Sequence, residues 1–142
     1  MKTKLFATLI VLFFTAVTSY ADDVPRIVLD GLNAYKSAGF TEAFNVWLKG
    51  SPMESDKTTT MNLKGGFTQI ESIFGKMIGY DVLKTTNISP VTNRTYIEIN
   101  YEKGPLFLYF DNYKSPSGWI IPTMKFHTEA DKILPSDMIN GK

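Results

Sequence analysis

The chain contains no cysteine and a single histidine, His127. Without cysteine it forms no disulfide, although small exported domains that lack a core usually depend on disulfides. One histidine and no thiol do not supply the ligand set of an ordinary zinc site, so we expect no metal and no cofactor. Such a domain must bury a hydrophobic core, and two Trp, seven Tyr and ten Phe are available to build it.

The chain also lacks a surplus of charge of either sign. It carries 15 Lys and Arg residues against 14 Asp and Glu residues, which gives a formal net charge of +1. Acidic and basic residues are interspersed, whereas proteins that bind nucleic acid gather basic residues on one face. We therefore expect no nucleic-acid partner.

One long apolar run is present, at the start of the chain, and it is short for a membrane span. Lys2 and Lys4 precede 13 mostly apolar residues, Leu5–Val17, whereas a spanning helix needs about 20. Small residues follow in Ser19-Tyr20-Ala21. This order predicts that residues 1–21 are a signal peptide, whose removal changes the formal net charge from +1 to −1.

We expect the remainder, residues 22–142, to be a single domain with no membrane anchor after cleavage. No repeat, linker or low-complexity segment divides it. The lysine-rich leader and the lack of disulfides favour a periplasmic or secreted bacterial protein. Residues 129–142 are expected to form a short helical turn and a partly frayed tail.

The first half of this domain has helical spacing. Apolar residues between Val24 and Tyr35 fall on one stripe, and Gly39 is expected to end this first helix. A second, shorter helix carries Phe44 and Trp47 and is expected to end over residues 50–52, at Gly and Pro.

A third helix is predicted to begin at Asp56, a residue type that caps helix N-termini. The pair Gly65-Gly66 predicts a weakened or kinked middle. Its core-facing side is expected to carry Met61, Phe67, Ile70, Ile73 and Phe74.

The second half changes to the period of β-strands. Between Thr95 and Glu102, Ile97 and Ile99 alternate with Tyr96 and Glu98. Short stretches rich in Gly, Pro and Ser separate four expected strands, at residues 80–88, 95–102, 106–113 and 119–128. The fold class is therefore α+β, with N-terminal helices packed on a curved four-stranded antiparallel sheet.

The third expected strand is apolar on both sides. Leu106, Leu108 and Phe110 point one way, and Phe107 and Tyr109 point the other. An antiparallel sheet with one solvated face alternates apolar and polar residues instead. We therefore expect a cover over the second face, either the helices or a partner chain.

Three helices followed by a four-stranded meander, over residues 24–128, resemble the NTF2-like superfamily, a cystatin-like cone. The stretch 109–121, which turns through Gly118-Trp119, carries the resemblance furthest. It implies a pocket at the open end of the cone and often a homodimer through the outer sheet face. Family members include isomerases, dehydratases and hydrolases besides proteins that only bind, and fold alone does not choose among them. No catalytic motif of the family matches here, so no catalytic residue is assigned.

Aromatic residues are the best candidates for the walls of a ligand pocket, although the same spacing is typical of plain core. His127 is the only histidine, so acid–base catalysis by histidine would depend on it. It also fits a surface position at the end of the last strand. Regular alternation would place it on one face with Trp119, Ile121 and Lys125. The candidate pocket residues are Tyr35, Trp47, Tyr109, Trp119 and His127.

Four carboxylates lie within expected strands or helices: Glu98, Asp111, Asp30 and Glu71. Two acids in one apolar pocket would allow general acid–base catalysis, whereas single acids on a polar face are ordinary surface residues.

In the absence of a reactive constellation, we expect an exported, non-catalytic module that binds a small apolar ligand or a protein. One alternative is a small-molecule enzyme of the isomerase, dehydratase or hydrolase type with its pocket in the cone. Another is an inhibitor or immunity-type protein that contacts its partner through a protruding loop at residues 51–57.

Overall fold

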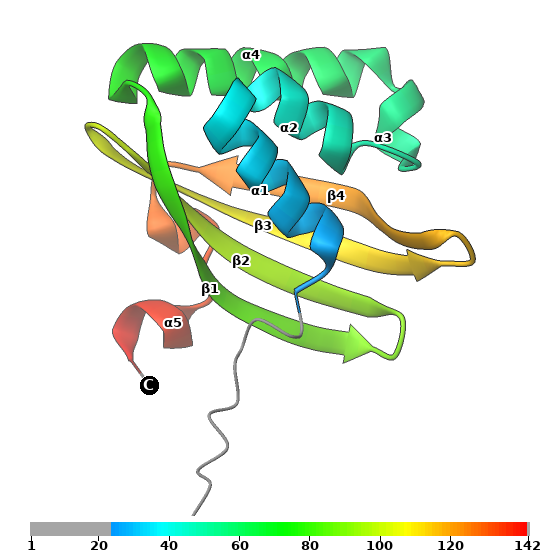
Figure 1. The fold of residues 1–142 in the computed structure, drawn as a ribbon. Coiled ribbons are helices and arrows are strands. Elements are labelled where there is room, and N and C mark those ends of the chain that lie inside the picture. The colour runs from blue at the N-terminus through cyan, green and yellow to red at the C-terminus, as the bar shows by residue number, and fades with distance from the viewer. Residues whose placement is uncertain (1–23, 142) are drawn as a thin grey trace, which may run out of the picture.

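The computed structural model describes residues 24–141 as a four-stranded antiparallel sheet with the N-terminal helices packed on one face (Figure 1). This confirms the predicted α+β class. The expected signal peptide, residues 1–21, lies outside the described residues. Within the described range, no helix has the length and apolar character needed to cross a membrane.

Four helices precede the sheet: α1 (Arg26–Ala38), α2 (Phe40–Trp47), α3 (Pro52–Ser55) and α4 (Lys57–Phe74). Gly39 separates α1 from α2 with a φ of 96°, a conformation that glycine adopts without steric cost. The prediction that the first helix ends at Gly39 is confirmed.

The segment 51–57 was expected to protrude as a loop, but it forms α3 and the start of α4. Pro52 opens α3 at a position where its missing N–H costs nothing, and Ser51 caps the helix. Asp56 caps α4 by accepting a hydrogen bond from the Thr59 N–H at 3.0 Å. The predicted start of the third helix is therefore confirmed.

Helix α4 packs on the core through residues three and four positions apart: Leu63, Phe67, Ile70 and Phe74. Met61 and Ile73, expected on the same side, are 72% and 54% exposed. Each lies six positions from Phe67, which corresponds to about 120° around a helix. Gly65 and Gly66 stay helical within α4.

The sheet has the order β1-β2-β3-β4, with β1 (Met77–Ser89), β2 (Thr92–Tyr101), β3 (Gly104–Ser115) and β4 (Gly118–His127). Two-residue turns join all three neighbouring pairs. The first three strands are longer than predicted, because residues such as Gly104 and Pro105 pair within β3 instead of forming a turn.

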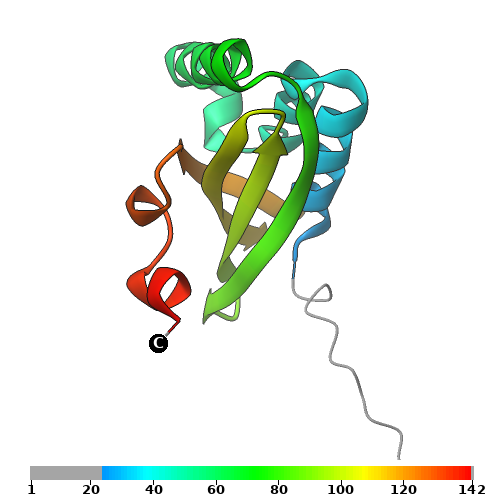
Figure 2. The ribbon, with the colours of Figure 1, turned by 90° about the vertical axis from the view of Figure 1, so that its left-hand side faces the viewer.

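Strand β1 is bent by three register irregularities against β2. At each one β1 holds an extra residue, which is Ile78, Leu83 or Ile88. Such bulges bend a strand and increase its twist. Figures 1 and 2 show β1 curving along the edge of the sheet.

Strand β4 also holds an extra residue. Tyr113 and Asp111 are two positions apart on β3, whereas their partners on β4, Ile120 and Thr123, are three positions apart. An extra residue reverses which face the following side chains occupy.

The prediction that Trp119, Ile121, Lys125 and His127 share one face is therefore wrong. Ile121 is fully buried in the core beneath the helices. Lys125 and His127 pair with Tyr109 and Phe107, whose side chains lie on the opposite, outer face of the sheet.

The inner face of the sheet and the helices form one hydrophobic core. Leu106, Leu108 and Phe110 of β3 are fully buried there. The ring of Phe67 lies 5.2 Å from that of Phe44 and 4.9 Å from that of Phe126, measured between centroids. Aromatic contacts thus join α2, α4 and β4.

The outer face of the sheet is covered in part by the end of the chain. The turn η2 (Ala130–Lys132) and helix α5 (Ser136–Asn140) lie on the side opposite to the helical layer (Figure 2). Tyr96 and Tyr109 on this face are 8% and 9% exposed. The sequence had suggested the helices or a partner chain as the cover, and the chain's own C-terminal part lies there.

Candidate functional site

Two adjoining clefts open on the helical side of the sheet. The larger, of about 750 Å³, lies between the start of α1 and the β1–β2 and β3–β4 turns. The second, of about 680 Å³, lies between α1, the end of α2 and the start of β4. Both are lined by Ile27, Ser117 and Trp119, and together they are called the Trp119 groove below.

The groove exists because α1 starts beside two turns of the sheet. Val24 and Pro25 are buried at the start of α1, and Ile27 adds an apolar wall. Gly118 opens β4 with a φ of 124°, which L-residues rarely adopt, and Trp119 follows directly. Trp119, which is half-buried, thus lines the same cleft as Ile27 of α1.

The rim of the larger cleft is polar and mostly neutral. Asn87, Ser89, Asn93 and Ser117 line it, and Arg26 is its one charged residue. The second cleft has one acid and one base on its wall, Asp30 and Lys49. An apolar wall with a few hydrogen-bonding groups is typical of small-molecule sites.

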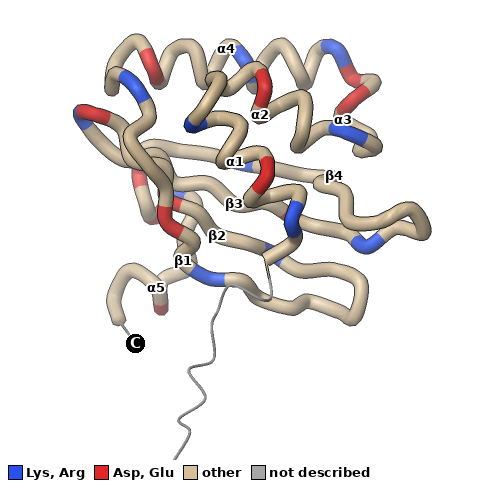
Figure 3. The backbone as a smooth tube through the Cα atoms, viewed as in Figure 1, with Lys and Arg blue, Asp and Glu red and all other residues tan. Residues whose placement is uncertain are grey.

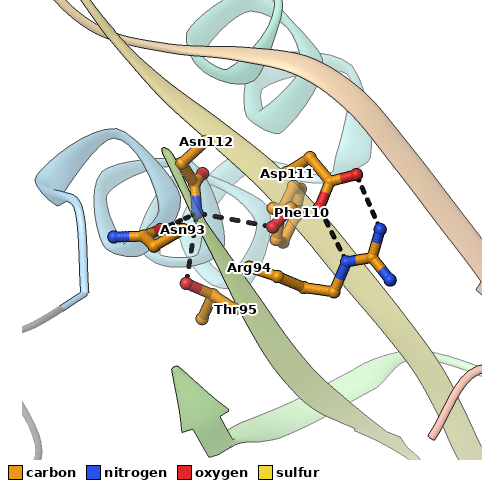
Figure 4. A network of polar contacts seen from close by, with 6 residues as sticks. All are labelled: Asn93, Arg94, Thr95, Phe110, Asp111 and Asn112. Carbon is orange, nitrogen blue, oxygen red and sulfur yellow. Dashed lines mark hydrogen bonds and ion pairs between the residues drawn. The ribbon is translucent and has the colours of Figure 1, made fainter. Parts of the chain in front are cut away.

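A buried network holds Asn93 in the groove wall (Figure 4). Nδ2 of Asn112 donates to Oδ1 of Asn93 at 2.8 Å and to Oγ1 of Thr95 at 3.2 Å. Asn112 is fully buried, and its Oδ1 has no hydrogen-bond partner among the described residues. An unpaired buried carbonyl costs free energy, which offsets part of the gain from the hydrogen bonds that Nδ2 donates.

On the outer face, Arg94 and Asp111 form a bidentate ion pair (Figure 4). Nε and Nη2 of Arg94 donate to the two carboxylate oxygens of Asp111 at 2.7 and 2.9 Å. The guanidinium carbon lies 3.9 Å from the ring centroid of Tyr109. The hydrogen bond to Asp111 raises the pKa of Arg94 above its ordinary value, so both charges are engaged with each other.

Tyr35 and Trp47 belong to the closed core. The hydroxyl of Tyr35 is 2.8 Å from that of Tyr101 and donates to Oε1 of Glu71 at 2.9 Å. Burial raises the pKa of Tyr35. Trp47 is fully buried, and its Nε1 donates to the Val28 carbonyl at 3.2 Å.

The five candidate pocket residues therefore lie in three places. Tyr35 and Trp47 are in the core, Trp119 is in the groove, and Tyr109 and His127 are on the outer face. Nδ1 of His127 accepts a hydrogen bond from the Glu129 N–H at 2.9 Å. The structure thus brings one of the five, Trp119, into the groove.

Sequence reasoning did not select Ile27, Asn87 or Asn93 for the site. A signal for Asn93 was present, because it precedes Thr95 and Ile97 in the inward alternation of β2. A polar residue at such a position needs a buried partner. No comparable signal marks Asn87, which is exposed near the end of β1.

The four carboxylates do not converge. Glu71 accepts from Tyr35, Asp111 pairs with Arg94, and Asp30 lines the groove. Within residues 24–141, no three His, Asp or Glu side chains gather in a way that would hold a metal ion.

In comparisons with known proteins, no family model, no curated protein and no solved structure matches this chain. The charged residues do not indicate a class of ligand or partner, because basic and acidic positions are interspersed over helices and strands (Figure 3).

Proposed function

We propose that this protein is an exported, non-catalytic binding module of the NTF2-like type, and that the Trp119 groove holds a small, largely apolar ligand. The observation that carries the proposal is the groove itself. The aromatic ring of Trp119, the apolar side chain of Ile27 and a set of mostly uncharged hydrogen-bonding groups line one groove. Helices on a curved four-stranded antiparallel sheet are compatible with the cone of that superfamily.

The distribution of titratable groups favours binding over catalysis. General acid–base catalysis needs groups within hydrogen-bond reach of the reacting atoms. Of the candidate acids and the histidine, Asp30 lines the groove, whereas His127 and Asp111 lie on the outer face. The inhibitor or immunity alternative has less support, because its contact loop at 51–57 is helical.

The two tryptophans provide a test by fluorescence. Trp47 is fully buried, whereas Trp119 is partly exposed in the groove. We expect the exported protein to bind 1-anilinonaphthalene-8-sulfonate and to transfer energy to it from Trp119. Trp119→Ala is expected to weaken this binding about tenfold, which corresponds to about 1.4 kcal/mol.

Tyr113→Ala is the matched control, because Tyr113 is an aromatic residue that is 42% exposed and lies outside the groove. It should leave the dye affinity unchanged. Equal affinities of the Trp119→Ala variant and the unaltered protein would exclude the groove as the binding site.

A further inference from the structure

The outer face of the sheet is covered in part by residues of the same chain. Residues 129–141, called the C-terminal segment here, cross this face on the side opposite to the helices (Figures 1 and 2). Nζ of Lys84 donates to Oδ2 of Asp137 at 3.2 Å, which ties α5 to β1. Ile133 and Leu134 of the segment are half-buried.

The attachment of this segment is weak. The Glu129 N–H donates to Nδ1 of His127, outside the segment. The bonds between backbone groups close within the segment, as from the Leu134 N–H to the Ala130 carbonyl at 2.7 Å and from the Gly141 N–H to the Asp137 carbonyl at 3.1 Å. The side chains of Lys84 and Asp137 are 42% and 50% exposed, and exposed ion pairs contribute little.

The segment also packs loosely on the sheet. Hollows of about 310 Å³ and about 390 Å³ remain between them. Lys84, Tyr96 and Pro135 help to line the first, and His127 and Ile133 the second. Both hollows are open to solvent, so the segment has few buried contacts with the sheet, which is typical of regions that open at low free-energy cost. None of the core residues lies beyond Phe126.

The face beneath the segment has a definite chemistry. The rings of Tyr96 and Tyr109 lie with centroids 6.0 Å apart, and Arg94 covers Tyr109. The charge of Arg94 is matched by Asp111, whereas Lys84 loses its partner when the segment leaves. The open face would therefore present aromatic surface beside the ammonium groups of Lys84 and of Lys125, which pairs with Tyr109 on this face.

We propose that the outer sheet face is a docking site for a peptide that carries two aliphatic residues and, three positions later, a carboxylate. The C-terminal segment is its built-in competitor, since Ile133-Leu134 and Asp137 have this spacing. Short amphipathic segments that lay apolar side chains into a hydrophobic groove are a recurring mode of recognition, and complementary charges fix their register. This site is separate from the Trp119 groove.

The test uses a chain that ends at Thr128 and, as the probe, a fluorescein-labelled synthetic peptide of residues 129–142. We expect the shortened chain to bind the peptide saturably. The intact chain should bind it at least about tenfold more weakly, because its own segment competes at a high effective concentration.

Charge reversal tests the predicted contact. Asp137→Lys in the peptide should weaken binding to the shortened chain about fivefold, and Lys84→Glu in the chain should restore it. Asp131→Lys in the peptide is the matched control. It changes the peptide charge equally, but the Asp131 carboxylate pairs within the segment, with Lys132, and is 64% exposed.

A folded shortened chain that does not bind the peptide would overturn the proposal. Intact protein with Asp137→Lys gives a second measurement that does not depend on truncation. It should bind the unaltered peptide more tightly than the intact wild-type chain does, and equal binding would also overturn the proposal. A two-chain particle that disappears on truncation would support docking and identify a second copy as the source of the peptide.

Discussion

At the scale of single residues, the packing of α1 on α2 depends on Gly31. A Cβ atom at Gly31 would overlap the indole of Trp47. The indole cannot retreat freely, because Trp47 is fully buried and its Nε1 donates to the Val28 carbonyl. Gly65, also inside a helix, has no such neighbour within 4 Å. The two glycines therefore separate the effect of close packing from that of helix propensity.

We predict that Gly31→Ala lowers the free energy of unfolding by about 1–3 kcal/mol, because the gain in helix propensity is outweighed by overpacking. Gly65→Ala should raise it by about 0.5–1 kcal/mol. Urea denaturation followed by circular dichroism measures both. Changes of the same sign in the two variants would contradict this account.

The outcomes for single residues also show how much of the site the sequence predicts. Trp119 was identified as a candidate pocket wall because it is aromatic, and it does line the groove. Tyr109 was identified by the same aromatic criterion, yet it lies on the other face. Residue type alone does not say on which side of a sheet an aromatic ring lies; strand pairing decides this.

At the scale of elements, the start of α4 depends on a charged cap. The carboxylate of Asp56 accepts from the Thr59 N–H at 3.0 Å and from the Thr59 hydroxyl at 2.7 Å. The backbone hydrogen bond, followed by the hydroxyl bond, lowers the pKa of Asp56 below its ordinary value of 3.8. The stabilisation is therefore complete above that value and is lost as the pH falls through the lower pKa of the folded state.

We predict that Asp56→Asn weakens the dependence of the melting temperature on pH between about pH 2 and about pH 5, because an amide caps without titrating. Asp56→Ala should lower the melting temperature at neutral pH, where Asp56→Asn changes it little. Thermal melts at both ends of this range measure the difference. An unaltered acid sensitivity of Asp56→Asn would argue against the cap as its source.

Elements also show why part of the fold was not predictable. The change from a period near 3.6 to a period of 2 predicted α1, α2, α4 and the four strands in the right order, but not the short helix α3. The extra residues at Ile78, Leu83 and Ile88, and the one in β4, leave the alternation within a single strand ambiguous. A bulge is defined by two paired strands, so one strand's sequence does not reveal it.

At the scale of the whole molecule, Phe67 connects the layers. Its ring lies within 6.5 Å, between centroids, of the rings of Tyr35, Phe40, Phe44, Trp47 and Phe126. These side chains come from α1, α2 and β4. The chain has no cysteine and so no disulfide, and this cluster is a main non-covalent contact between helices and sheet.

We predict that Phe67→Ala lowers the free energy of unfolding by about 3–5 kcal/mol, a large part of the total for a small domain. Helices and sheet should still unfold in one transition, seen as coincident curves from circular dichroism and from Trp47 fluorescence. Phe67→Leu, which fills more of the volume, should cost less. Separate transitions for the two signals would show that the layers are independent.

The two-residue turns have a consequence for how the chain reaches this structure. Each strand pairs with the next one along the sequence, so every pairing closes a small loop. The entropy cost of closing such a loop is small. Chains whose contacts are local in sequence collapse to the native state faster than those that must unite distant segments. Formation of the meander can therefore begin at any of its three hairpins.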